Sequence, residues 1–209
     1  MKYDEFKQKV RGLPVFSSTL LSALTEQGET LKVQLTGWKK KGWILGLRKG
    51  LYVLNRDDRQ IEPSHFFLAN QIFIPSYVSL ESALAFYGLI PEFVAATTSV
   101  TSRKTCEFTN EFGVFTYQHL QPKSYTGFTT IKESEKISYL IAAPEKAVVD
   151  FIYLNLASFG AKDRNIFKES YRFQNCDKLK IRKLADYAAS FETKKLCEII
   201  GLFIEETIR

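Results

Sequence analysis

Apolar positions within residues 28–54 change from a helical spacing to the pattern of strands. When residues are stepped by about 100°, Leu35 and Trp38 fall within about 40° of Leu31 and form one apolar stripe. This stripe predicts a helix. Gly42 is placed to end it, because glycine accepts the left-handed backbone of a C′ residue.

A tight β-hairpin is expected directly after this helix. Trp43–Leu47 and Leu51–Leu54 are rich in aromatic and branched residues, as strands are. Gly50 lies in the connection and supplies the positive φ that a tight turn needs. The tip of the hairpin therefore presents two basic side chains, Arg48 and Lys49.

The helix face away from the apolar stripe is polar and basic. Its members lie roughly 80–200° from Leu31, and they are Lys32, Val33, Thr36, Lys39 and Lys40. A helix followed by a basic hairpin is typical of the end of a winged helix-turn-helix, in which the helix enters the major groove of DNA and the hairpin lies along the backbone. Lysines on a helix face are more often a solvated surface. The hairpin tip, the short preceding helix and the local charge favour DNA contact here.

Two shorter helices are expected upstream. Tyr3, Phe6 and Val10 share one face of the first, and Ser17 is a good N-cap for a second that runs to about Leu24. Three short helices and a hairpin within about fifty residues make up a winged-helix module.

A polar stretch at residues 55–60 is the best domain boundary. We therefore expect a winged helix-turn-helix over residues 1–56 and a second domain over residues 57–209. In the second domain the patterns predict helices, then strands, then helices: helices 63–71 and 80–87; strands 96–101, 105–109, 114–120, 127–131 and 137–142; helices 144–156, 162–172, 179–191 and 193–208. Residues 102–104 are expected to be the turn between the first two strands. The predicted fold class is α+β, with a mixed α/β second domain that holds a small, mainly antiparallel sheet and C-terminal helices.

The charge of the chain is concentrated at its N-terminal end. Residues 1–60 hold 12 Lys and Arg against 6 Asp and Glu, whereas residues 61–209 hold 17 of each. The whole net charge of +6 thus falls in the segment that is expected to meet DNA. A positive patch also suits RNA or anionic lipid, but the helix and hairpin favour duplex DNA.

Composition narrows the remaining function classes. Three cysteines without CxxC spacing suit a reduced, cytoplasmic protein. No apolar run approaches the roughly 20 residues of a membrane span, and no signal peptide is indicated at the N-terminus. With two histidines in the chain we expect no zinc site, no other metal and no cofactor.

Two polar segments raise the alternative of an enzyme. Ser76, Ser79, Glu81 and Ser82 would need a histidine base for hydrolase chemistry, and neither His65 nor His119 has sequence support for that role. Ser79 is better interpreted as a helix N-cap, with Glu81 on the positive end of the helix dipole.

The second segment is Pro144-Glu145-Lys146 with Asp150. It resembles a nuclease set but lacks a second paired carboxylate. Pro144 and Glu145 are typical of any helix start, and Lys146 and Asp150 have the spacing of a helical ion pair. Asp150 is alternatively a hydrogen-bond partner of a neighbouring loop. A further basic cluster, Lys178, Lys180, Arg182 and Lys183, is interpreted as the solvated face of a helix.

Four stretches in order resemble the AbiEi family, the antitoxin and autorepressor component of type IV toxin–antitoxin systems. They are WKKKGWILGLRKGLYVL (Trp38–Leu54), SYVSLESALAFYGLIPE (Ser76–Glu92), TSVTSRKTCEF (Thr98–Phe108) followed by Gly127-Phe128, and IAAPEKAVVDFIYL (Ile141–Leu154). Each is modestly specific alone, and the order and spacing carry the resemblance over most of the chain.

The resemblance implies an N-terminal winged helix and a C-terminal antitoxin domain. It also implies that the first domain binds repeats in the protein's own promoter, and that the second counteracts a nucleotidyltransferase-like toxin without requiring a stable complex. The expected function is thus a non-enzymatic DNA-binding autorepressor and antitoxin. The alternatives are a nuclease-like effector, or a protein-interaction module, that carries a winged helix. The predicted DNA-binding residues are Lys32, Val33, Thr36, Lys39, Lys40, Arg48 and Lys49.

Overall fold

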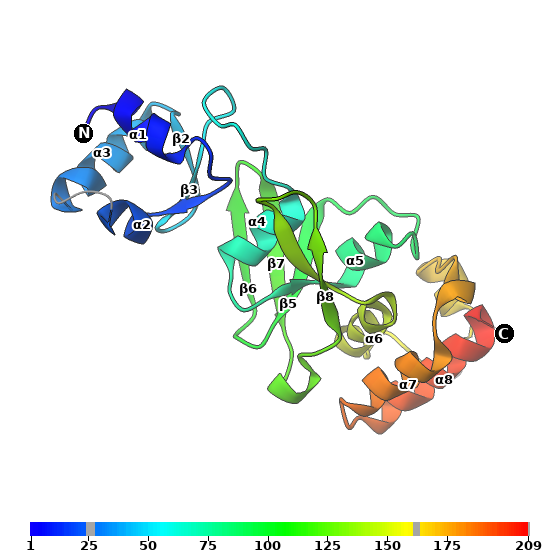
Figure 1. The fold of residues 1–209 in the computed structure, drawn as a ribbon. Coiled ribbons are helices and arrows are strands. Elements are labelled where there is room, and N and C mark those ends of the chain that lie inside the picture. The colour runs from blue at the N-terminus through cyan, green and yellow to red at the C-terminus, as the bar shows by residue number, and fades with distance from the viewer. Residues whose placement is uncertain (24–27, 161–163, 209) are drawn as a thin grey trace.

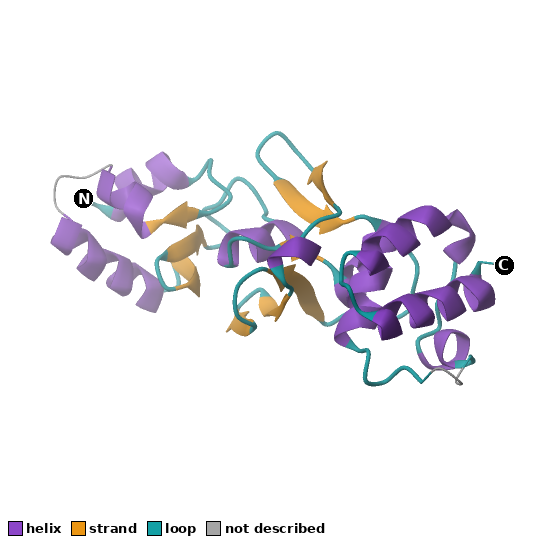
Figure 2. Ribbon diagram, turned by 90° about the horizontal axis from the view of Figure 1, so that it is seen from below, coloured by secondary structure: helices purple, strands orange, loops and turns teal. Residues whose placement is uncertain are grey.

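A computed structural model describes residues 1–23, 28–160 and 164–208, and for residues 21–23 and 28–32 it describes the backbone alone. Two sheets organise a mixed α/β chain (Figure 1). The smaller sheet belongs to an N-terminal unit, residues 1–60, and the larger to the body, residues 61–209. The two chain ends lie at opposite ends of the molecule in both views (Figures 1 and 2).

The described part of the N-terminal unit holds three helices and three short strands. Its elements are α1 (Tyr3–Val10), β1 (Phe16–Ser17), α2 (Ser18–Ala23), α3 (Gly28–Lys40), β2 (Ile44–Arg48) and β3 (Leu51–Leu54). The strands form an antiparallel sheet in the order β1-β3-β2. The expected helices over 3–10 and from residue 28, and the expected hairpin, are confirmed.

Aromatic side chains fill the core of the N-terminal unit. Phe6 of α1 stacks on Trp38 of α3 with ring centroids 4.6 Å apart, and it meets Phe16 of β1 edge-on at 5.5 Å. Leu35 and Trp38 are buried, as the apolar stripe predicted. The side chain of Leu31, the third member of the stripe, lies outside the described residues.

The hairpin of β2 and β3 packs on both of its faces. Ile44 and Leu54 point into the N-terminal core, whereas Leu47, Leu51 and Val53 are buried in the core of the body. The hairpin thus buries apolar side chains in the cores of both units. This burial holds the N-terminal unit against the body.

The body is built around a six-stranded sheet with helices beside it (Figure 2). Its elements in chain order are α4 (His65–Ile72), β4 (Tyr77–Val78), α5 (Leu80–Phe86), β5 (Ala96–Thr101), β6 (Cys106–Asn110), β7 (Gly113–His119), a 3-10 turn (Pro122–Ser124), β8 (Phe128–Lys132), β9 (Ser138–Ala142), α6 (Pro144–Leu154), a π-helical turn (Ile166–Ser170), a 3-10 turn (Cys176–Lys178), α7 (Ile181–Ala189) and α8 (Lys194–Thr207). The strand order is β6-β7-β5-β4-β9-β8.

Strand pairing in this sheet contradicts the expected turn at residues 102–104. β5 does not pair with β6 across residues 102–104; it runs parallel to β7, which lies between them. β6 and β7 form the tight hairpin instead, because Gly113 adopts a φ of +111° and closes the turn after Asn110. With β4 parallel to β9 as well, the sheet is mixed, with antiparallel pairs β6–β7, β4–β5 and β8–β9.

Several helix boundaries in the body depart from those expected. α4 begins at His65 rather than at Pro63, because the hydroxyl of Ser64 accepts a hydrogen bond from the amide of Phe67 and caps the helix there. The helix expected over 162–172 is reduced to the π-helical turn Ile166–Ser170, and residues 161–163 lie outside the description. Among the described helices, none combines the length and the apolar character that a membrane span requires.

Candidate nucleic-acid interface

The end of α3 is set by a Schellman motif. The amide of Trp43 donates to the carbonyl of Trp38 at 3.0 Å, and the amide of Gly42 donates to the carbonyl of Lys39 at 3.0 Å. Gly42 has a φ of +69°, as the sequence predicted for a C′ glycine. This turn sends the chain directly into β2, so that the hairpin begins beside the last turn of the helix.

The hairpin tip, Arg48–Gly50, carries its two cations into solvent. Gly50 has a φ of +78°, which confirms the predicted turn. Its carbonyl accepts a hydrogen bond of 2.9 Å from the amide of Ser18 at the start of α2. The side chains of Arg48 and Lys49 are both exposed. The guanidinium of Arg48 donates to the carbonyl of Lys49 at 3.2 Å. The tip is thus anchored through its backbone, while both charged side chains remain exposed to solvent.

Lys39 joins the helix face to the hairpin. A Cβ atom built on Gly46 of β2 would lie 2.9 Å from the Nζ and 3.1 Å from the Cε of Lys39. The end of the lysine side chain therefore lies directly over the backbone of β2 at Gly46. Lys39 thus brings a positive charge of α3 next to β2.

Most of the predicted DNA-binding residues share this exposed surface. Thr36, Lys39 and Lys40 are exposed on α3, and Val33 is 74% exposed although it is apolar. A side chain of this kind on a polar helix face is free for apolar contact with a partner. The side chain of Lys32 lies outside the described residues.

Arg103, in the loop after β5, is a basic residue that was not among the predicted DNA-binding residues. It lines a hollow of about 310 Å³ together with Arg48 and Lys49, next to the rings of Phe73 and Phe108. Its guanidinium donates to the carbonyl of Ile74 at 3.1 Å and lies 4.7 Å from the centroid of Phe73. In the sequence, two adjacent basic residues in the loop at residues 102–104 were the feature that could have indicated this contact. Only tertiary packing brings that loop beside the hairpin tip.

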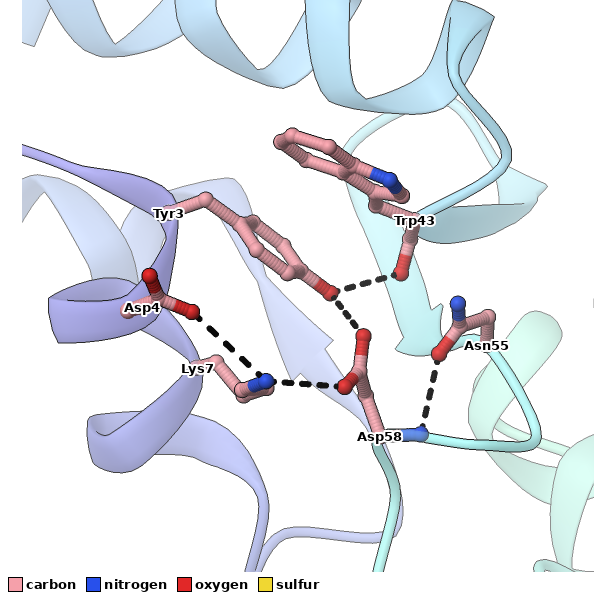
Figure 3. A network of polar contacts seen from close by, with 6 residues as sticks. All are labelled: Tyr3, Asp4, Lys7, Trp43, Asn55 and Asp58. Atoms are coloured by element: carbon pink, nitrogen blue, oxygen red, sulfur yellow. Dashed lines mark hydrogen bonds and ion pairs between the residues drawn. The ribbon is translucent and has the colours of Figure 1, made fainter.

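A polar network fastens the end of the N-terminal unit to its first helix (Figure 3). The carboxylate of Asp58 accepts hydrogen bonds from the hydroxyl of Tyr3 at 2.7 Å and from the ammonium of Lys7 at 3.0 Å. The amide of Asp58 donates to the side chain of Asn55 at 3.0 Å, and the hydroxyl of Tyr3 also approaches the carbonyl of Trp43 at 3.1 Å. The predicted boundary at residues 55–60 is thus packed against α1.

The network shifts the ionisation of its members. Burial acts to raise the pKa of Asp58, but the hydrogen bonds from Tyr3 and Lys7 outweigh it, and the pKa lies below its ordinary value. The hydrogen bond to Asp58 raises the pKa of Lys7 against a smaller effect of burial. Burial, followed by the contact with Asp58, raises the pKa of Tyr3. At neutral pH the network is therefore an ion pair with a phenol donor.

Three of the enzyme candidates from the sequence, Ser79, Lys146 and Asp150, lie together with Tyr77 in a buried cluster of the body. Tyr77, Ser79, Lys146 and Asp150 are all buried without solvent exposure. One oxygen of Asp150 accepts from Ser79 at 2.8 Å and from Tyr77 at 3.0 Å, and the other pairs with the ammonium of Lys146. The predicted ion pair between Lys146 and Asp150 is confirmed. Asp150 also accepts hydrogen bonds from Tyr77 in β4 and from Ser79, which lies just before α5.

Side-chain capping by Ser79 was a wrong expectation. Ser79 does occupy the N-cap position of α5, but its hydroxyl donates to Asp150 and makes no capping bond. Burial acts to raise the pKa of Asp150 and to lower that of Lys146. The ion pair and its two hydroxyl donors satisfy these groups, and no solvent-facing nucleophile is left among the four.

The two histidines stand apart from this cluster. His65 stacks on Phe115 with ring centroids 6.3 Å apart, and the Nδ1 of His119 lies 2.8 Å from the carbonyl of Arg103.

Glu145, another of the enzyme candidates, accepts a hydrogen bond from the amide of Lys180 at 3.0 Å and so holds the start of α7. Within the described part of the chain, no three histidine, cysteine or acidic side chains gather closely enough to hold a metal ion.

Comparison with protein-family models matched no family, and a search of curated proteins found no relative of this chain.

Proposed function

We propose that the N-terminal unit is a winged helix that binds double-stranded DNA, with α3 as the recognition helix and the β2–β3 hairpin as the wing. The observation that carries this proposal is that basic side chains of α3 and of the hairpin tip are exposed, in a unit that holds the entire net charge of +6. Duplex DNA carries a dense line of phosphate charges that such a surface complements. A neutral body leaves this as the one strongly basic region in the sequence.

Each exposed residue has a role in this proposal. Arg48, Lys49 and Lys40 contact phosphates, which fix the position of the protein on the duplex. Val33, Thr36 and Lys39, together with Lys32, lie nearest the base edges. Lysine can donate to guanine, while valine and threonine can touch a thymine methyl group.

Arg103 extends the phosphate-binding surface from the hairpin tip onto the body. Its contacts with Ile74 and Phe73 hold the guanidinium in place before DNA arrives, so little side-chain freedom is lost on binding. The recognition helix carries no arginine or asparagine in its reading positions. Shape and phosphate contacts therefore supply much of the affinity.

The biological role we propose is that of an antitoxin that represses its own promoter. This step rests on the resemblance of four sequence stretches to the AbiEi family. In this role the body counteracts a nucleotidyltransferase-like toxin, and no stable complex with that toxin is required. No enzymatic activity, metal or cofactor is part of the proposal, which places the protein in the cytoplasm. The nuclease alternative lacks support because Ser79, Lys146 and Asp150 are buried and engaged with one another.

A gel-shift titration with the protein's own upstream DNA, against scrambled DNA at two salt concentrations, tests the proposal. We expect tighter binding to the upstream fragment. The variant with alanine at Lys39, Lys40, Arg48 and Lys49 should weaken binding at least about tenfold, because each lost phosphate contact also removes counterion release. Alanine at Arg48 and Lys49 alone should weaken binding to all sequences alike and flatten the salt slope by about one to two units.

The matched control removes four positive charges elsewhere. Alanine at Lys178, Lys180, Arg182 and Lys183, which are exposed in and before α7, should leave DNA affinity within about twofold of the parent. Equal losses of affinity in both quadruple variants would mean that binding depends on net charge alone and not on the proposed surface. Equal weak binding to upstream and scrambled DNA would contradict the repressor.

A further inference from the structure

The hollow beside Arg103 lies where the N-terminal unit meets the body, and we call it the junction hollow. Its volume of about 310 Å³ is about ten times the share of one water molecule in the liquid. Its lining residues come from the hairpin tip, from α4 and the segment after it, from the loop after β5 and from β6: Arg48, Lys49, Ile72, Phe73, Ile74, Arg103 and Phe108. The hollow thus gathers cations from both units of the molecule.

Three positive charges surround the junction hollow with no acid among its described lining residues. Arg48, Lys49 and Arg103 are all exposed. In the part of the chain that the structure describes, none of the three forms an ion pair. Strand alternation turns the exposed Glu107 of β6 to the face opposite Phe108. The lining therefore leaves this concentrated positive charge without neutralisation.

Contacts within the lining hold both guanidinium groups at the junction hollow. That of Arg103 lies 4.7 Å from the ring centroid of Phe73 and donates to the carbonyl of Ile74 at 3.1 Å. That of Arg48 donates to the carbonyl of Lys49 at 3.2 Å. Each of these hydrogen bonds uses one donor of a group that has five N–H donors. The other N–H groups remain for a ligand.

Two aromatic rings give the junction hollow an apolar wall. Phe73 and Phe108 are half-buried, with ring centroids 5.9 Å apart and planes tilted by 45°. An apolar wall lowers the local dielectric and so strengthens the attraction between the cations and an anion. Guanidinium groups match the oxygens of phosphate, and aromatic rings receive nucleic-acid bases. Together these groups suit a phosphate that is joined to a sugar and a base.

We propose that the junction hollow binds the phosphate ester of a nucleoside, with the phosphate between Arg48 and Lys49 of the hairpin tip and Arg103 of the body. The same group occurs in a free nucleotide and in the backbone of DNA. With DNA as its source, the inference rests on the proposed function and adds a discrete phosphate site to the basic surface. With a free nucleotide as its source, the occupant competes with DNA for Arg48 and Lys49 and so regulates DNA binding.

Nuclear magnetic resonance titration of the full chain with thymidine 5′-monophosphate tests the site. We expect saturable shifts of the side-chain Nε–H groups of Arg48 and Arg103 and of the backbone amide of Lys49, with a dissociation constant of about a millimolar. Thymidine, which lacks the phosphate, should give no saturable shift of these groups. Absence of saturation by the monophosphate, or equal affinity for thymidine, overturns the proposal.

Single-charge variants separate the junction hollow from a general attraction to basic residues. R103A should weaken binding of the monophosphate at least about fivefold, because it removes a lining charge and its fork of donors. K104A is the matched control, since Lys104 is the exposed neighbour of Arg103 in the same loop but lies outside the lining. It should stay within about twofold of the parent. K49A removes a lining charge from the hairpin tip, and it replaces R103A if that variant does not fold. A loss no larger than that of K104A overturns the assignment.

The gel-shift titration with upstream DNA distinguishes the two sources of the phosphate. A salt slope flatter by about one unit in R103A, together with its weaker binding of the monophosphate, assigns the site to the DNA backbone. Unchanged DNA binding by R103A assigns it to a free nucleotide.

The site and the repressor function can also fail separately. Saturation by the monophosphate without a preference for upstream DNA supports the site and contradicts the repressor. A preference for upstream DNA without such saturation overturns the site alone.

Discussion

Asp150 shows how one side chain decides between a catalytic and a structural interpretation. In the sequence it is an acid placed four residues after a lysine, in a segment that resembles part of a nuclease set. In the structure both of its oxygens are occupied and the whole group is buried. Neighbours more than 70 positions away, Tyr77 and Ser79, supply two of its three bonds. Partners so distant in the chain cannot be predicted from local spacing. The sequence therefore predicted the ion pair of Lys146 and Asp150 but not its hydrogen bonds with Tyr77 and Ser79.

Removing Asp150 should therefore damage stability strongly. D150A leaves the ammonium of Lys146 buried without its partner, and we expect the free energy of unfolding to fall by about 3–5 kcal/mol. Urea denaturation measures the loss. E198A is the matched control, since Glu198 forms an exposed pair with Lys194 at the same four-residue spacing and 3.9 Å. That control should cost about 0.3–0.5 kcal/mol. A D150A loss as small as that of E198A would mean that the buried pair contributes no net stability.

At the scale of elements, the sequence correctly predicted those features that depend on interactions between residues close together in the chain. The stripe at Leu35 and Trp38, the left-handed glycines at positions 42 and 50, and the ion-pair helix α6 all follow from residues within one or two turns. The pairing of β5 with β7 did not follow, because a parallel partner is chosen by long-range packing. Arg103 was missed for the same reason: its loop reaches the hairpin tip only after the sheet has formed.

The segment after β3 offers an element-scale test through Asp58. Because its folded pKa lies below the ordinary value of about 4, the carboxylate contributes stability above that value, and the contribution is lost as pH falls through the folded pKa. The raised pKa of Lys7 keeps the pair intact through neutral pH. We expect D58N to be less stable than the parent by a constant amount between about pH 5 and 8, and the gap to shrink below about pH 4.

Thermal unfolding at a series of pH values measures this gap between the parent and D58N. D57N is the control, because Asp57 is the exposed neighbour in the same turn. It should follow the parent at every pH. A gap for D58N that stays constant down to pH 3 would show that the carboxylate charge does not stabilise the segment.

At the scale of the whole molecule, the two units share one hairpin. β2 lies against β6 of the body, and the side chain of Asn110 donates to the carbonyl of Leu47 at 3.1 Å. Lys136, in the turn between β8 and β9, donates to the carbonyl of Gly12 at 3.0 Å. A polar stretch at residues 55–60 marked a boundary in the sequence, but it could not reveal that Leu47, Leu51 and Val53 point into the body. Alternation in a strand assigns two faces, and here both are buried.

This shared hairpin makes cooperative unfolding the expected behaviour of the full chain. A unit that buries Leu51 in the core of the other cannot unfold alone without exposing that core, so calorimetry should show one transition, with equal calorimetric and van't Hoff enthalpies. L51A should lower the free energy of unfolding by about 2–5 kcal/mol and move the whole transition. V33A, which truncates the exposed valine of α3, should stay within about 0.5 kcal/mol of the parent. Two separate transitions, of which L51A moves only the first, would mean that the hairpin belongs to the N-terminal unit alone. In that case the fold would not fix the position of the basic surface relative to Arg103.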